Sequence, residues 1–229
     1  MKYLNLGILL LGSFNQLSAQ TIESENNSSE TLYQISFGET LPENVLKREF
    51  IDQTIWTITN STDSILFESV DGNSLKNIKF NQPGNYFLSM RFDESIHTSH
   101  ADECFHPSIP ERIKLVVSPF RLVFDFENLS FSTDIVGGKE LSGATLVVPV
   151  KYSNYSGNTM ELPSLKMMSA GVNTTIQGVL KDDKTTLSPG LNQLTYSLKG
   201  SASKDSYIMF DFYDLTGGIQ SYSFPTIIK

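Results

Sequence analysis

Cysteine is nearly absent from this chain, because Cys104 is the only one among 229 residues. A single thiol cannot form an internal disulfide, so an apolar core must hold the fold together even in an oxidising compartment. Basic residues are also scarce: 17 lysines and arginines stand against 25 acidic residues, which gives a formal net charge of −8. Because phosphate backbones repel such a chain, we expect no nucleic-acid partner.

Long apolar runs are missing as well. The longest one at the amino end, residues 6–11, is far shorter than the roughly 20 residues that a membrane-spanning helix needs. Lys2 precedes this run and the small residues of Leu17-Ser18-Ala19 follow it, which is the pattern of a signal peptide over residues 1–19. We therefore expect an exported protein, periplasmic, at the cell surface or extracellular, with no integral membrane segment in the mature chain.

Catalytic signatures are lacking too. The sequence contains no nucleophile elbow, zinc-protease motif, phosphate-binding loop or dinucleotide-binding fingerprint. A nucleophilic role for Cys104 would need an oxyanion hole on a rigid frame, which the polar sequence around it does not offer. We therefore expect a protein that is not an enzyme.

Strand-like segments fill the part of the chain that follows. Apolar and polar residues alternate with the period of a β-strand, and turn residues such as Asp71-Gly72-Asn73 separate the segments. In the first half the predicted strands are 54–59, 64–70, 77–80, 85–92 and 112–118. Helical periodicity is missing except for a short candidate within 42–50. The fold class that we predict is all-β.

A family resemblance rests on the stretch FNQPGNYFLSMRF at residues 80–92. It resembles the signature of PKD-type, immunoglobulin-like β-sandwich domains of exported Bacteroidota proteins, through Phe80, Pro83, Gly84, Tyr86, Leu88 and Met90. The resemblance covers residues 32–118 and implies a sandwich with Trp56 in its core. Physically, Tyr86 can place its ring in the core while its hydroxyl reaches nearby backbone. WTITNST replaces the usual aspartate-glycine run after the tryptophan, which favours the wider immunoglobulin-like class over PKD itself.

A second run of strands is expected after Pro119. The predicted strands are 120–126, 144–153, 173–180, 192–200, 205–214 and 219–228. Ile208, Phe210 and Phe212 share one face of their strand, as a core face requires, and a tight turn is predicted at Gly217-Gly218. This closing hairpin is similar to that of the immunoglobulin-like TraQ conjugation proteins. The predicted layout is a signal peptide (1–19), a disordered lead-in (20–31) and two tandem immunoglobulin-like β-sandwiches (32–118 and 119–229).

A long polar loop between the strands 85–92 and 112–118 holds all the histidines and the cysteine. His97, His100, Cys104 and His106 offer nitrogen and sulfur donors, which suit tetrahedral zinc and are also accepted by copper. The alternative is an ordinary polar loop whose histidines bind nothing. The sequence establishes no cofactor, and zinc is the ion expected if this loop binds metal.

The function that we expect is binding of a protein or glycan partner at the cell surface or in the periplasm. Five tyrosines could supply a sugar-stacking or partner-binding face, with ordinary cross-strand packing as the alternative: Tyr152, Tyr155, Tyr207, Tyr213 and Tyr222. Two other functions stay open. One is a metal-binding protein that uses the loop 97–106, and the other is an accessory component of an envelope or conjugation assembly.

Overall fold

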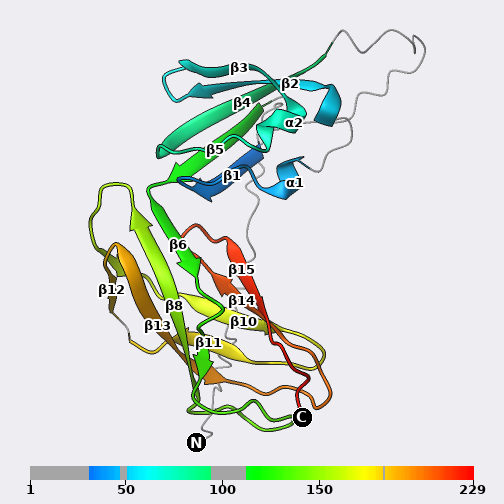
Figure 1. Cartoon of the computed structure of the whole chain (residues 1–229), viewed down its shortest axis with the longest axis vertical. Helices are drawn as coiled ribbons and strands as arrows, with labels where there is room; N and C mark the ends of the chain where they lie inside the picture. Colours follow the sequence, from blue (N-terminus) through cyan, green and yellow to red (C-terminus); the bar gives the residue numbers. More distant parts are fainter. Residues whose placement is uncertain (1–30, 47–50, 94–111, 183) are drawn as a thin grey trace, which may run out of the picture.

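The computed structural model describes residues 31–46, 51–93, 112–182 and 184–229. The prediction of an all-β fold is confirmed, because its strands form a five-stranded sheet, an eight-stranded sheet and a two-stranded ribbon. Figure 1 shows the two large sheets one above the other along the length of the molecule. The helices of the described residues are single turns: α1 (Glu43–Leu46), the 3-10 helix η1 (Ile51–Gln53) and α2 (Gly72–Leu75).

The five-stranded sheet has the order β1-β5-β4-β2-β3, in which β1 runs parallel to β5 and the other pairs are antiparallel. Its strands are β1 (Thr31–Ser36), β2 (Thr54–Asn60), β3 (Ile65–Asp71), β4 (Gly84–Phe92) and β5 (Arg112–Ser118). In β2 the side chains of Thr54, Trp56 and Ile58 are buried while those between them are half-buried. This period of two places one face of the strand in a core, as the sequence predicts.

The core of this sheet lies on one of its faces and centres on Trp56, which is fully buried. The layer opposite the sheet consists of connecting segments rather than a further run of long strands. Val45 of α1 and Leu75 of α2 are fully buried in the same cluster, and Glu39 and Phe80 form an isolated antiparallel bridge. The helical turns and this bridge therefore complete a sandwich-like arrangement.

The start of α2 explains the turn signal Asp71-Gly72-Asn73. The carboxylate of Asp71 accepts a hydrogen bond from the backbone N–H of Ser74 at 2.9 Å and caps the helix. Hydrogen bonds to Ser74 lower the pKa of Asp71. Gly72 is buried so tightly that a Cβ there would collide with the carbonyl of Ile51. A helical turn therefore follows β3, where the sequence predicts a simple turn.

Tyr86 fixes the corner that leads into β4. Its hydroxyl donates a hydrogen bond to the backbone carbonyl of Gln82 at 2.7 Å, and its ring contacts Phe80 edge-on with centroids 5.1 Å apart. Burial raises the pKa of Tyr86, with a smaller contribution from Tyr155. Phe80 and Tyr86 are thus in direct contact across a turn that the Tyr86 hydrogen bond holds in place.

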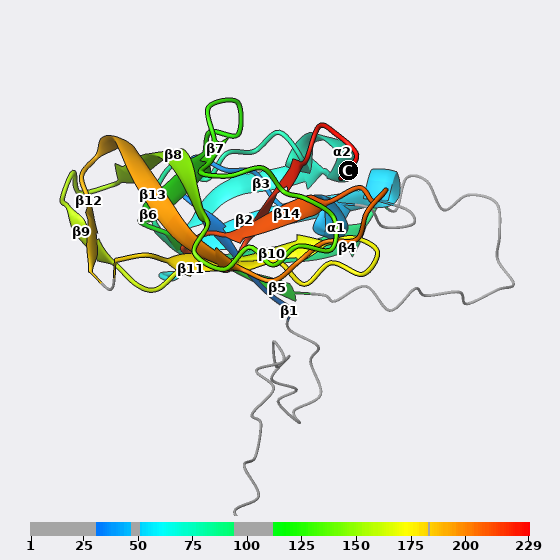
Figure 2. The same cartoon turned by 90° about the horizontal axis from the view of Figure 1, so that it is seen from below.

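The eight-stranded sheet has the order β15-β14-β10-β11-β13-β8-β6, and β7 also pairs with β8. Its strands are β6 (Phe120–Phe124), β7 (Ser130–Phe131), β8 (Thr145–Asn154), β10 (Lys166–Ala170), β11 (Gln177–Leu180), β13 (Gly190–Lys199), β14 (Met209–Tyr213) and β15 (Ile219–Ser223). All of its pairs are antiparallel. The remaining strands, β9 (Met160–Leu162) and β12 (Thr185–Leu187), pair with each other and lie together beside one end of β13 in Figure 2.

The two edges of the eight-stranded sheet meet, because the sheet curls round its own core. Gln220 in β15 accepts a hydrogen bond from the backbone N–H of Phe124 in β6 at 3.1 Å. Its side-chain N–H donates to the backbone carbonyl of Leu122 at 2.7 Å. β6 and β15 are the strands at the two ends of the strand order, and among the described residues no β-ladder pairs them with each other. The side-chain amide of Gln220 therefore links the two edges of the sheet.

Inside this curl lies an aromatic core. Phe210 and Phe212 are fully buried, and Ile208 is nearly so. Phe212 contacts the rings of Phe124, Phe126 and Tyr196 with centroid distances between 5.1 and 5.7 Å. The face that the sequence assigns to the core is therefore the buried one.

Two contacts join the sheets at the passage from β5 to β6. Arg121 Nε lies 3.5 Å from Glu39 Oε1, and the rings of Phe37 and Tyr155 meet edge-on at 5.9 Å. The two buried apolar clusters share no residue: one takes its members from 35–117 and the other from 122–228. The assignment of two immunoglobulin-like domains with these boundaries stays a prediction.

Candidate functional site

The four candidate metal ligands lie outside the described residues. His97, His100, Cys104 and His106 all fall within residues 94–111, so the proposal of a zinc or copper site stays a prediction. In the part of the chain that the structure does describe, no group of three or more histidine, cysteine or acidic side chains could hold a metal ion. No other metal centre is therefore proposed.

The five tyrosines of the proposed sugar-stacking face do not lie on one surface. Tyr152 is fully buried, and Tyr222 is half-buried against Phe126 and Phe210. Burial raises the pKa of Tyr222, as expected for a ring within a core. Tyr155 and Tyr207 are exposed. A common platform of these five residues is therefore excluded, because two of them pack inward.

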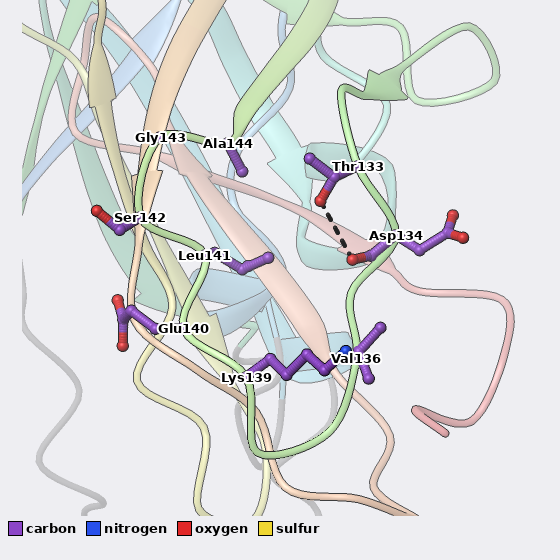
Figure 3. A pocket seen from close by; sticks show the side chains of 9 residues that line it. All are labelled: Thr133, Asp134, Val136, Lys139, Glu140, Leu141, Ser142, Gly143 and Ala144. Carbon is purple, nitrogen blue, oxygen red and sulfur yellow. Dashed lines mark hydrogen bonds between the residues drawn. The ribbon is translucent and has the colours of Figure 1, made fainter.

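A surface depression of about 350 Å³ lies among residues 133–144, between β7 and β8. Figure 3 shows that the carboxylates of Asp134 and Glu140 point away from each other on opposite sides of it. Glu140 also accepts a hydrogen bond from the backbone N–H of Gly200, which ties the loop to the end of β13. The two carboxylates therefore do not converge on one point, as a pair acting in acid–base chemistry would.

The strand β3 presents the most unusual surface among the described residues. It is the last strand in the order of the five-stranded sheet and pairs only with β2, so its other backbone edge has no strand partner in the described parts of the chain. Three consecutive apolar residues on it are exposed: Ile65 at 58%, Leu66 at 44% and Phe67 at 44%. Figure 1 places β3 at the outer margin of the upper sheet. We call the run Ser64–Glu68 the β3 edge.

Both faces of the β3 edge carry an apolar side chain. Ile65 is paired with Thr59, whose side chain is on the outer face of the sheet, and Phe67 is paired with Ile58, which is fully buried. Directly paired residues point to the same side of a sheet, so the register shift between these two pairs turns Ile65 and Phe67 to opposite faces although they are two positions apart. A segment placed beside them would therefore find apolar surface above and below its backbone.

Irregularities bound the β3 edge at each end. The turn that precedes it is closed by Asn60, whose side-chain oxygen accepts hydrogen bonds from the backbone of Thr62 and Ser64. At the other end, the pairing with β2 shifts between Phe67 and Val70, as at a β-bulge, and Ser69 adopts a left-handed backbone with φ of 55°. A second shift lies inside the run, between Ile65 and Phe67. Because β-bulges limit how far another strand can pair along an edge, only a short run of β3 is accessible for pairing.

The sequence predicts a strand at 64–70 but does not reveal that it lies at an edge. A partial signal is present: the apolar run Ile65-Leu66-Phe67 breaks the alternation seen in β2 and lies between Asp63 and Glu68. Strands buried on one face alternate, and an unbroken apolar run usually indicates burial on both faces, so the run marks an unusual strand without revealing its exposure. The position of β3 in the strand order must be known before this run can be interpreted as part of an exposed edge.

No helix among the described residues is long and apolar enough to span a membrane. Comparison of the chain with protein family models finds none that matches, and comparison with curated protein sequences finds no significant match.

Proposed function

We propose that this protein is an exported, non-enzymatic binding protein that captures an extended segment of a partner polypeptide at the β3 edge. The observation that carries the proposal is the exposure of three consecutive apolar residues, Ile65 to Phe67, on a strand that, in the described part of the chain, is paired on one side only. The expected complex adds a sixth strand to the five-stranded sheet.

The physical reason is that a strand edge and an apolar surface are both costly to leave in contact with water. An unpaired edge presents backbone N–H and carbonyl groups in the geometry that another strand needs. Burial of apolar surface then contributes roughly 25 cal/mol per Å² to binding before the entropy cost of association is subtracted. Trp56 and Ile58 of the neighbouring strand β2 are fully buried, so β3 lies against a firmly packed frame.

A polypeptide partner is favoured over a glycan by the position of the aromatic residues. Sugar binding commonly needs aromatic rings that lie flat and exposed, and the candidate set is split by the burial of Tyr152 and the packing of Tyr222. The β3 edge offers backbone and aliphatic groups instead, which match a β-strand.

Support for an immunoglobulin-like fold comes from the first half of the chain. The locked corner at Tyr86 and the buried Trp56 are the features expected of an immunoglobulin-like sheet. Export is inferred from residues 1–19, which lie outside the described residues. A metal-binding role of loop 97–106 and an accessory role in an envelope or conjugation assembly stay predictions, and neither conflicts with strand capture.

The experiment is a binding titration with a fluorescent seven-residue strand-forming peptide, Thr-Gln-Val-Thr-Val-Gln-Thr, followed by anisotropy. Leu66→Lys introduces a charge on the edge and should weaken binding at least fivefold, because lysines on edge strands block pairing. The control is Leu191→Lys, since Leu191 is 84% exposed and lies on β13, an internal strand of the other sheet. Equal binding by wild type and Leu66→Lys would refute the proposal.

A further inference from the structure

The charged residues of β3 and of the turn before it are all acidic. Asp63, Glu68 and Asp71 are exposed, and residues 61–72 contain no lysine, arginine or histidine. Asp71 is engaged as the cap of α2 through Ser74. Asp63 and Glu68 remain, one on each side of the apolar run, so the edge has an apolar centre and two acidic ends.

The open run is also short. The left-handed residue Ser69 interrupts the extended backbone directly after Glu68, and the Asn60 turn closes it on the other side. A partner segment therefore meets at most about five residues of β3, and these include a register shift between Ile65 and Phe67, whose side chains lie on opposite faces of the sheet.

This inference rests on the proposed capture of a strand at β3. We infer that the partner segment is a short apolar β-strand flanked on both sides by lysine or arginine. Opposite charges placed across neighbouring strands attract each other and like charges repel, so basic flanks would complement Asp63 and Glu68. The rest of the chain adds to the same preference, because its formal net charge of −8 attracts basic segments at low salt.

Self-pairing of β3 with a second copy fits these charges poorly. Antiparallel pairing of two β3 edges would bring two acidic strands together, and each chain carries the same net charge of −8. Repulsion between like charges opposes such a dimer. The charge pattern thus selects a basic partner rather than another copy of this chain.

The test compares three labelled peptides against the full chain. The neutral probe is Thr-Gln-Val-Thr-Val-Gln-Thr, and lysine or glutamate replaces both glutamines in the basic and acidic probes. At low salt the basic probe should bind about five- to tenfold more tightly than the acidic one, and the ratio should fall toward one at high salt as ions screen the charges. In the double variant Asp63→Asn/Glu68→Gln the ratio should also collapse, whereas Glu161→Gln, an exposed change on β9, should leave it unchanged.

The outcomes separate this inference from the proposed function. If all three probes bind equally and Leu66→Lys weakens each of them, strand capture stands and the basic partner is refuted. If no probe binds, or if binding is indifferent to Leu66→Lys, both are refuted. A dimer in analytical ultracentrifugation that Leu66→Lys abolishes would assign the β3 edge to a second copy and overturn the inference.

Discussion

The side chain of Gln220 is hydrogen-bonded to the backbone of Phe124, although 96 positions separate the two residues. Its amide also donates to Leu122, so it occupies two backbone groups of β6 as a neighbouring strand would. The edges of the eight-stranded sheet are thereby joined, whereas the described residues supply no strand partner for the β3 edge of the other sheet. The contrast between a closed and an open edge underlies our functional proposal.

Replacement of Gln220 by alanine should lower the free energy of unfolding by about 1–3 kcal/mol, because two partly buried backbone groups lose their partners. Gln193→Ala, at an exposed position of β13, is the matched control and should change stability by less than about 0.5 kcal/mol. Urea unfolding followed by circular dichroism measures both. Equal midpoints for the two variants would show that the edge closure contributes nothing to stability.

Tyr196→Phe should stabilise the protein by about 1 kcal/mol at pH 8. Tyr196 is fully buried, and its hydroxyl has no hydrogen-bond partner among the described residues, which is a costly arrangement. Tyr207→Phe, at a residue that is 69% exposed, is the control and should be neutral. A loss of stability in Tyr196→Phe would mean that the hydroxyl has a favourable contact.

The same variant predicts a pH dependence. Burial raises the pKa of Tyr196, whereas a tyrosine in the unfolded chain ionises near its usual pKa of about 10. Above pH 10 the unfolded state therefore holds fewer protons than the folded state, and stability falls as the pH rises. The stability advantage of Tyr196→Phe over wild type should be constant below pH 9 and should grow between pH 10 and pH 11. A constant difference across that range would contradict the raised pKa.

Replacing both Gly217 and Gly218 with valine should cost about 1–3 kcal/mol. Gly217 has a φ of 79°, as a tight turn requires, so this part of the sequence prediction is confirmed. For Gly218 the reason is different, because a Cβ there would lie 2.7 Å from the carboxylate of Asp214, which caps the turn. Ser223→Val, in the exposed part of the same hairpin, is the control, and an unchanged denaturant midpoint in the double variant would count against the turn.

Asp63→Gly should raise stability by about 0.5 kcal/mol, because it relieves a left-handed residue at the cost of some chain entropy. Asp63 has a φ of 56° and is the fourth residue of the turn that begins at Asn60. Gly217 is the fourth residue of the corresponding turn that begins at Asp214. Both turns place a side-chain oxygen on the backbone two and four residues later. The reverse change, Gly217→Asp, should destabilise. Thermal unfolding of the pair tests this, and a destabilised Asp63→Gly would refute the equivalence.

Local patterns in the sequence predict much of the fold. Period-two alternation locates β2, β8, β13 and β14, and the Phe80–Tyr86 signature predicts the corner that a hydrogen bond to Gln82 fixes. Shorter elements are missed: β9 and β12 have three residues each, too few to show a period. The predicted strand 77–80 is reduced to the single bridge at Phe80, because the backbone N–H groups of Asn77 and Ile78 donate back to Ser74 and Leu75 in the turn that follows α2.

The candidate site could not be predicted in the same way. An edge is a property of strand order, and strand order depends on pairings such as β1 with β5 that join residues about 80 positions apart. The sequence shows that Ile65, Leu66 and Phe67 are apolar, but not that β3 has one neighbour instead of two among the described strands. The hydrogen bonds between Gln220 and β6 likewise form only because the curled sheet brings β15 close to β6, which no local sequence pattern predicts.

The most direct test of strand capture is amide NMR of the full chain titrated with the neutral seven-residue probe. If the probe pairs with the β3 edge, the backbone amides of residues 64–68 should show the largest shifts, and their hydrogen exchange should slow as new hydrogen bonds form. Amides of β13, an internal strand, should stay unchanged. Shifts that fall outside β3, or bound probe with no slowing of exchange at residues 64–68, would contradict the account.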